Sequence, residues 1–470
     1  MSSYSINPLE QAFNQGHYQD VLHQIDELKD NDVPDIHSKL KLYYFESRTY
    51  ERLGKWETAW NIYLEAENIV TSYSQKDKLA NLILLVTKLY LLWRLGSQDE
   101  AKETINSKKD FISQLENELL VNDANNYEYW LGLYFIIQFN IYLNLGNLEK
   151  ALLVNEKSLT YFRHINYEFY LSKVMINFGL IHRLKGELQT ALESFTDGSV
   201  LAEKNNDPIT LIEGLYETGI SNYLLGEFDE AIKYLTESLT IAISINNLSS
   251  QAKIYFKLIT LYYSKELKIE TSKYVDLLNK ISQSSIKNNY TKQLAIIGSS
   301  LSELLTGTMK GYVTAQDKLK EVLNDPVVDF DIQIFCNILL TEIYLVEYQT
   351  FYNNSTLEEI ERVLGNLFTL ANKNNSIIIS IESRLLQARI QYIAGNFDKA
   401  ENIFNQTEKI ATENNLNLLK TKIVSEHKKF VDSINQMKKN LNKRSENDVT
   451  SIRNYIQELK KVALQMGDMK

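Results

Sequence analysis

One stretch decides the fold of this chain: PITLIEGLYETGISNYLLGEFDEAIKYLTESLTIAISIN, residues 208–246. Pro208 suits the first turn of a helix, and the Asn206-Asp207 pair before it can cap the free backbone N–H groups. Apolar residues recur at near-helical spacing on both sides of Gly226, which can end a helix in the left-handed conformation. The stretch therefore predicts two amphipathic helices joined by a tight turn, and neither can bury its apolar stripe without neighbours.

The small and aromatic residues of this hairpin stand in a known order. Gly219, Gly226, Phe228, Ala231 and Ser238 follow the sequence small residue, turn glycine, aromatic, alanine, small residue. This order resembles the consensus of the tetratricopeptide repeat, whose usual period is about 34 residues. The longer period here resembles the extended repeats of kinesin light chains, spindle-orientation adaptors and Rap-type peptide-sensing regulators.

Two markers repeat in phase along the chain. The turn glycine recurs at Gly16, Gly54, Gly96, Gly146, Gly186, Gly226 and Gly395. Asn-Asn or Asn-Asp pairs, which cap helices and tolerate turns, mark the junctions between units. We predict an all-α protein in which residues 1–415 form about ten helix-turn-helix repeats. The repeats match best over 123–246 and 375–415 and are degenerate over 247–374, and the second helix of the third repeat is expected at about 98–121.

The resemblance implies a right-handed α-α superhelical solenoid for residues 1–415. After residue 415 the pattern changes to apolar residues spaced four and three apart, which is typical of a coiled-coil seam. Residues 416–470 carry 12 Lys and Arg against 6 Asp and Glu. This segment is expected either to cap the solenoid as a helical hairpin or to form a coiled coil, and the coiled coil could join two copies in a homodimer.

Composition excludes several classes of protein and partner. The net charge of −10 disfavours nucleic acid as a partner. The most apolar runs, 82–95 and 131–145, contain polar residues and are too short for a membrane span. The single cysteine, Cys336, lies in an apolar helical run and is expected to be an inert core thiol. With no signal-peptide pattern, the expected location is the cytoplasm.

No catalytic or cofactor pattern is present in the sequence. We find no phosphate-binding glycine loop, no dinucleotide fingerprint, no His-Glu-x-x-His and no Gly-x-Ser-x-Gly. His17 and His23 share the first repeat without a third candidate ligand at helical spacing, so no metal site is expected. The sequence therefore favours a protein without enzymatic activity, cofactor or metal.

The resemblance also implies which residues line the concave side, because the first helix of each repeat faces it. Aligned on the turn glycines, the partner-binding candidates are Tyr44, Arg48, Tyr90, Trp93, Asn140, Arg183, Tyr216, Tyr223, Tyr263, Arg389 and Tyr392. Aromatic rings supply contact area and arginines supply forked donors, as in many protein interfaces. Packing between helices is the competing explanation for about half of the aromatics, Tyr90 and Trp93 first. The arginines are better candidates for an accessible groove, because burying them unpaired is costly.

Three functions remain open at this stage. The first is a scaffold or adaptor that binds a peptide or helix of a partner protein in the concave groove. The second is a ligand- or peptide-responsive regulator of the Rap type. The third is an enzyme whose site lies in the degenerate repeats, at residues 247–374.

Overall fold

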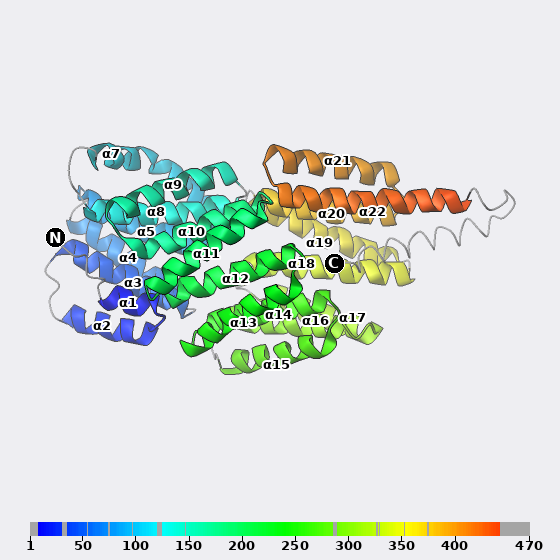
Figure 1. Cartoon of the computed structure of the whole chain (residues 1–470), viewed down its shortest axis with the longest axis horizontal. Helices are drawn as coiled ribbons and strands as arrows, with labels where there is room; N and C mark the ends of the chain where they lie inside the picture. The colour runs from blue at the N-terminus through cyan, green and yellow to red at the C-terminus, as the bar shows by residue number, and fades with distance from the viewer. Residues whose placement is uncertain are drawn as a thin grey trace. The chain divides into compact units, whose positions relative to one another are not determined.

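The computed structural model describes residues 8–30, 35–53, 55–73, 76–95, 97–119, 125–145, 147–284, 289–325, 328, 330–351, 353–373 and 376–441. Among these residues every regular element is a helix, and the helices run in sequential pairs (Figure 1). The described part of the chain contains no β-strand. The predicted all-α repeat architecture is confirmed.

The helices of the first six repeats are α1 Pro8–Asn14, α2 Tyr18–Asp30, α3 Ile36–Arg52, α4 Trp56–Tyr73, α5 Lys78–Arg94, α6 Gln98–Ser107, α7 Lys109–Leu119, α8 Asn125–Asn144, α9 Leu148–His164, α10 Glu168–Leu184, α11 Leu188–Lys204, α12 Pro208–Leu224 and α13 Phe228–Ser244. The remaining helices are α14 Leu248–Ser264, α15 Lys268–Ser284, α16 Asn289–Leu304, α17 Met309–Leu323, α18 Phe330–Phe351, α19 Asn354–Lys373, α20 Ile377–Ile393, α21 Phe397–Glu413 and α22 Asn417–Leu441.

The α12–α13 hairpin forms for the reasons visible in its sequence. Pro208 occupies the first turn of α12, and the Asp207 carboxylate accepts a hydrogen bond from the Thr210 N–H at 3.0 Å. Gly226 has a φ of +87°, which a residue with a Cβ rarely adopts. Gly219 lets the two helices approach, because a Cβ there would lie 2.8 Å from Cγ of Leu235.

The asparagine markers are the junctions between repeats. Asn166, Asn206, Asn246 and Asn415 have φ values between 52° and 56°, the left-handed region that asparagine tolerates better than most residues. Each turns the chain from the second helix of one repeat into the first helix of the next. At the α14–α15 turn, where the sequence lacks a glycine, Glu266 takes this conformation itself, with a φ of 54°.

One expected helix is interrupted. The prediction of a single helix over about 98–121 is corrected by the structure, which separates α6 from α7 at Lys108. The Lys108 N–H bonds to both the Thr104 and Ile105 carbonyls, at 3.2 and 3.3 Å, so the last turn of α6 tightens. The Lys108 carbonyl then accepts the first hydrogen bond of α7, from the Ile112 N–H.

The chain divides into two compact units, which we describe separately. The first comprises Met1–Arg183, Glu187–Leu258 and Asp276–Ala295, and the second comprises Leu184–Gly186, Ile259–Val275 and Ile296–Lys470. Within the first unit, first helices of neighbouring repeats pack on one another, as α3 does on α5 and α5 on α8. This stacking brings side chains from distant repeats to one side of the unit.

In the second unit, α22 continues the repeat pattern beyond residue 415. Ile423 and Phe430 of α22 are buried. Lys422 reaches back to the Glu382 carboxylate at 2.7 Å, a partner 40 residues away. The first part of α22 therefore takes the place of a first helix in an eleventh repeat. The rest of the predicted 416–470 segment, from residue 442 on, lies outside the described residues.

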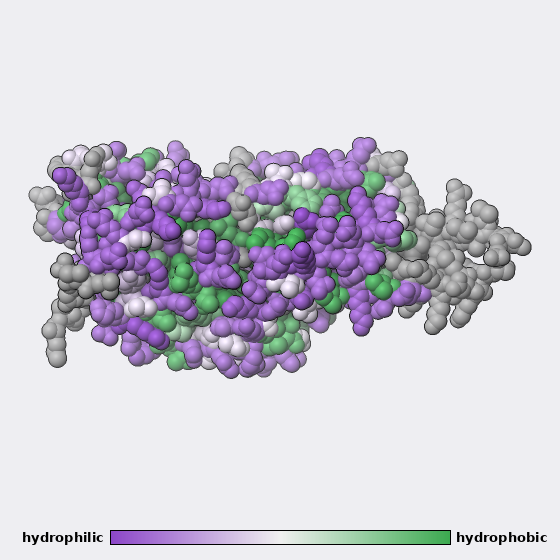
Figure 2. Space-filling view, turned by 90° about the horizontal axis from the view of Figure 1, so that it is seen from above, coloured by the Kyte–Doolittle hydropathy of each residue, from purple (hydrophilic) through white to green (hydrophobic). Residues whose placement is uncertain are grey.

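No helix in the described ranges has the length and apolar character needed to cross a bilayer. Hydrophilic residues cover most of the face in Figure 2, with smaller apolar areas between them.

Candidate functional site

The first helices of the first unit form two regions with different properties. The first part, which we call the filled interior, is formed by α1, α3, α5, α8 and the start of α10. The second, which we call the charged face, is formed by α10, α12 and α14 and belongs to repeats five to seven. The two parts are built from the same kinds of residue.

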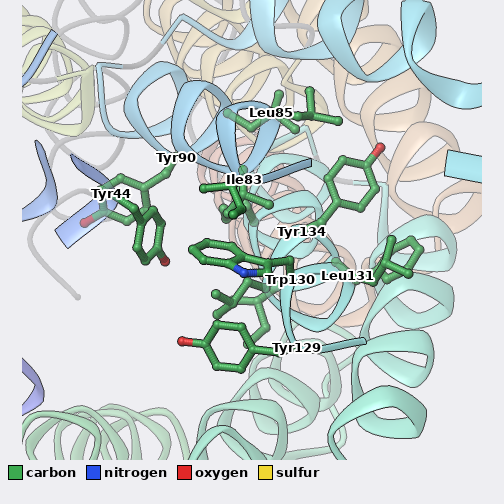
Figure 3. Packing of buried hydrophobic residues seen from close by; sticks show 14 of the residues in the cluster. Tyr44, Ile83, Leu85, Tyr90, Tyr129, Trp130, Leu131 and Tyr134 are labelled. Atoms are coloured by element: carbon green, nitrogen blue, oxygen red, sulfur yellow. The ribbon is translucent and has the colours of Figure 1, made fainter. Parts of the chain in front are cut away.

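Aromatic rings occupy the filled interior. Trp130 of α8 lies between Tyr44 and Tyr129, with ring centroids 4.9 Å and 5.3 Å away (Figure 3). Phe13 of α1 packs edge-on against Phe45 of α3 at 5.5 Å. Repeat one thus touches repeat two, and repeat two touches repeat four, through rings that are buried.

Arg48 is enclosed by these aromatic rings. Its guanidinium carbon lies 4.5 Å from the ring centre of Phe13, 5.0 Å from that of Tyr44 and 4.7 Å from that of Tyr90. One terminal nitrogen donates a hydrogen bond to the Tyr44 hydroxyl at 2.8 Å. A cation among three aromatic faces is stabilised electrostatically, so Arg48 belongs to the packing of this interior.

Two buried carboxylates complete the filled interior. The Glu51 side chain is 1% exposed and accepts hydrogen bonds from the Tyr90 hydroxyl and Arg94 Nε, both at 2.7 Å. Burial raises the pKa of Glu51, but the charges of Arg94 and Arg52 outweigh it and hold the pKa below its usual value. Glu10 of α1 accepts a hydrogen bond from the Tyr129 hydroxyl at 2.6 Å.

The tyrosines around Glu10 respond to its charge. Burial first, and the Glu10 carboxylate second, raise the pKa of Tyr129 well above its ordinary value. The same two causes, in the same order, raise the pKa of Tyr170. These phenols therefore stay neutral near pH 7.

The charged face has a different arrangement, with charges at matching positions of successive repeats. Lys173 of α10 donates to the Glu213 carboxylate of α12 at 2.5 Å. Lys253 of α14 lies 4.6 Å above the Tyr216 ring centre on α12. Lys173, Glu213 and Lys253 are each 40 residues apart, so one register position carries a row of alternating charges.

A second row of charges runs beside the first. Arg183 of α10 pairs with Glu217 of α12 at 3.0 Å. Lys257 of α14 is close enough to both to interact electrostatically. Burial, and then the positive charge of Arg183, lower the pKa of Lys257 to about 8, whereas Glu217 acts in the opposite direction. An amine in this environment is sensitive to any added negative charge.

Residues of the N-terminal repeats also act on the charged face. Burial raises the pKa of Glu213, but Lys173, Lys253 and Arg52 of α3 together bring it below its usual value. Gly16, in the turn after α1, lies beside Ile209 of α12, since a Cβ there would be 3.7 Å from the isoleucine Cδ1. Repeats one and two therefore approach the edge of this face.

The structure places the predicted concave residues in three kinds of environment. Tyr44 and Tyr90 are 1% and 3% exposed and belong to the filled interior. Trp93 is half-buried and packs on the Tyr90 ring at 5.8 Å. Arg48, expected in an accessible groove, is enclosed instead, because α1 and α5 supply rings on its sides. The open groove predicted along the first repeats is thus corrected to a packed interior.

Asn140 lies half-buried on α8, and its amide donates to the Ile136 carbonyl of its own helix at 3.0 Å. Arg183, Tyr216 and Tyr223 are half-buried on the charged face or beside it. Their side chains are the predicted residues that combine accessibility with neighbouring charges. Their role in partner binding stays a prediction.

The last three predicted residues lie in the second unit. Tyr263 is half-buried. Arg389 is held by two hydrogen bonds to the Glu426 carboxylate of α22, at 2.7 and 3.1 Å. Tyr392 is buried against Phe430 of the same helix, at 4.1 Å between ring centres. Both residues contact α22, so neither is free to line an open groove here.

Sequence reasoning missed several residues of the charged face. Lys173, Glu213, Glu217, Lys253 and Lys257 were not among the aligned positions, which were chosen at three fixed offsets from the turn glycine. Their own spacing was the available signal, because charges that recur 40 residues apart fall at one place on successive first helices. Across the described ranges, no three His, Cys, Asp or Glu side chains gather as ligands for a metal ion.

Comparison with known proteins identifies the fold. A scan against protein-family models finds no match, and a search of curated proteins finds none either. Among solved structures, the chain resembles a Rap protein complexed with competence and sporulation factor, with a TM-score of 0.50 and 10% identity. That match covers 80% of this chain and 99% of the other.

Two further structures are less similar. Aspartyl phosphate phosphatase F from Bacillus subtilis matches with a TM-score of 0.43 and 15% identity, over 87% of this chain and 94% of the other. The apo form of RapI matches with a TM-score of 0.39 and 13% identity, over 60% of this chain and 99% of the other. Taken with the repeat geometry above, the first of the three similarities shows that this chain has the fold of a tetratricopeptide-type helical-repeat solenoid.

Proposed function

We propose that this protein is a non-enzymatic interaction protein that binds a peptide or helix of a partner on the charged face. The proposal rests on aromatic and charged side chains that come together from three successive first helices. Arg183 of α10 and Tyr216 of α12 are half-buried, and Lys253 of α14 is exposed. Arg183 pairs with Glu217 of α12, and Lys253 lies over the Tyr216 ring. Binding sites concentrate such residues, since rings supply area and arginine supplies directed donors.

The filled interior supports this assignment by exclusion. Its rings and charges already contact one another, and a ligand would have to separate them. On the charged face Lys253 is exposed, and Arg183, Tyr216 and Lys257 are half-buried, so a partner can contact them without unfolding the first repeats. Binding of a partner on the charged face needs no catalytic group.

A selection from a peptide library displayed on phage, performed with the full chain, tests the proposal. We expect Tyr216→Ala and Arg183→Ala each to weaken the selected peptides by about 1–4 kcal/mol, the range for truncated anchor residues. Tyr234→Ala on α13 is the matched control, because Lys233 lies over the Tyr234 ring at 5.3 Å as Lys253 lies over Tyr216. Selected peptides that bind all four proteins equally would show that the groove is elsewhere.

A second candidate function is a regulator whose conformation responds to a bound peptide. The similar Rap protein was solved in complex with competence and sporulation factor, and this chain has the same fold. Small-angle scattering with and without a selected peptide distinguishes the two functions. A change in dimensions favours the regulator, and unchanged dimensions with full binding favour the scaffold.

A further inference from the structure

We infer that α1 is an internal occupant of a second binding site, from which it is displaced by a partner helix that carries an acidic residue three positions before an aromatic residue. The site lies in the filled interior, between α3 and α8. It is distinct from the charged face, on which the proposed function rests. Three features of α1 support this: how far it reaches, the chemistry of its two anchors, and a buried group that it leaves unsatisfied.

α1 contacts a helix that a first repeat does not ordinarily reach. In a solenoid each repeat touches its neighbours only. Phe13 follows this rule, since its ring packs on Phe45 of α3 in the second repeat. Glu10, however, accepts a hydrogen bond from the Tyr129 hydroxyl of α8 in the fourth repeat, 119 residues away. α1 therefore lies across the first helices of other repeats, as a bound segment would.

Two anchors of different chemistry hold α1. Glu10 and Phe13 are three residues apart, so they share one face of the helix. The Phe13 ring is buried, and the Arg48 guanidinium carbon lies 4.5 Å from its centre. Glu10 is 2% exposed, accepts the bond from Tyr129 at 2.6 Å and lies 3.9 Å from Lys41 Nζ. The site therefore recognises a carboxylate and an aromatic ring at this spacing.

α1 depends on these anchors for its position. It comprises seven residues, a length at which an isolated helix is marginal in water. Its own advantage over an external helix is the covalent link to α2. A short link of this kind gives an effective concentration on the order of millimolar. A partner helix that binds the site tightly enough to exceed this concentration displaces α1.

α1 also leaves one buried group unsatisfied. The side-chain amide nitrogen of Asn14, next to Phe13 in the sequence, is buried and has no hydrogen-bond partner within the described residues. A buried donor without an acceptor is unfavourable. A partner helix with an apolar residue at this position avoids that cost, so it can bind the site more tightly than α1 does.

The test uses the full chain and a labelled peptide of residues 8–17, blocked at both ends, with binding followed by fluorescence anisotropy. In the Phe13→Ala chain the tethered α1 loses an anchor and competes less well. The free peptide should therefore bind this chain at least about tenfold more tightly than the wild-type chain.

Peptide and chain controls assign the effect to the two anchors. The Phe13→Ala peptide should not bind, and the Glu10→Gln peptide should bind at least about threefold more weakly, because a carboxylate accepts a hydroxyl bond more strongly than an amide does. The Phe195→Ala chain is the matched control. It removes a buried ring from α11, where that ring packs against Gly179 of α10, and it should bind the peptide no better than the wild-type chain.

Hydrogen exchange of the wild-type chain at low urea concentrations tests the same site without a substitution. α1 should exchange through a local opening whose free energy changes little with urea. α8 should exchange through a larger unfolding that urea promotes strongly. This measurement decides the question even if the Phe13→Ala chain fails to fold.

Two results would overturn the inference. One is a folded Phe13→Ala chain that binds the peptide no better than the wild-type or Phe195→Ala chain. The other is exchange of α1 only together with α8 at every urea concentration, which would make α1 a fixed part of the core. Neither result bears on the charged face, because peptides selected there are expected to depend on Tyr216 and Arg183.

Discussion

The filled interior and the charged face occupy equivalent positions in successive repeats, yet one is packed and the other is accessible. Both take tyrosine, arginine and glutamate from first helices. In the filled interior, α1 contributes Phe13 and Glu10, and the Trp130 ring closes the space between Tyr44 and Tyr129. On the charged face, cations lie beside cations, and the rings of Tyr216 and Tyr223 are half-buried. The comparison shows that neighbours from other repeats decide whether a repeat position is core or surface.

The two regions should therefore respond differently to the loss of an aromatic ring. Trp130→Ala should destabilise the chain by about 3–5 kcal/mol, because it leaves a cavity among buried rings. Tyr216→Ala removes a half-buried ring and should cost about 1 kcal/mol. Urea unfolding followed by circular dichroism measures both. Equal shifts in the two variants would mean that the two regions are packed alike.

A buried charge should produce the next largest effect. Glu51→Gln keeps the size of the side chain but leaves Arg94 and Arg52 without their counter-charge, so we expect a loss of about 2–4 kcal/mol at pH 7. The folded-state pKa of Glu51 lies below its usual value. Its stabilising contribution is therefore present above the unfolded pKa, about 4.3, and is lost as pH falls through the folded pKa. The difference between the two proteins should shrink below about pH 4, and a difference independent of pH would contradict the ion-pair assignment.

On the charged face, removing a charge should raise the free energy of unfolding, whereas it should lower it in the filled interior. Lys257→Met should stabilise the chain by about 1–2 kcal/mol at pH 7, after allowance for partial solvent screening, because the folded state disfavours this ammonium group. The folded pKa of about 8 lies below the unfolded value of 10.5. The unfolded chain binds the proton more readily between these values, so wild-type stability should rise with pH there relative to the variant. Urea midpoints at pH 7 and 9.5 test this, and a destabilised variant at both values would contradict it.

The smallest effect concerns the ion pairs between repeats. A double-mutant cycle on the half-buried pair Lys173–Glu213 should give a coupling of about 0.5–1 kcal/mol. Lys204–Glu168 is the control, since its side chains are 62% and 52% exposed, and its coupling should be about 0–0.5 kcal/mol. A stronger coupling in the exposed pair would show that burial does not set the strength of these contacts.

The architecture could be predicted from the sequence because single residues at the turns determine it locally. Gly226 and the junction asparagines each require a backbone conformation that few residues adopt, and their spacing alone gives the repeats. Accessibility was harder to predict, because it depends on contacts across several repeats. The environment of Arg48 is set by Phe13 and Tyr90, from different repeats, and that of Arg389 by Glu426 of α22. Such neighbours follow from how the repeats stack, which the offsets from a glycine do not encode.

The charged face could be predicted from the sequence only in part. Its 40-residue charge spacing is present in the sequence, but only the structure shows that Lys257 is half-buried beside Arg183 and Glu217. The periodicity of charge could have identified these residues as candidates, but it does not show which of them pair.

Hydrogen–deuterium exchange of the full chain, with and without a library-selected peptide, tests the central claim most directly. We expect slower exchange in α10, α12 and α14 on binding, with α3, α5 and α8 unchanged, because the ligand contacts the charged face and leaves the filled interior intact. Protection confined to α3, α5 and α8 would contradict the account, since it would mean that the rings around Arg48 open to receive the partner.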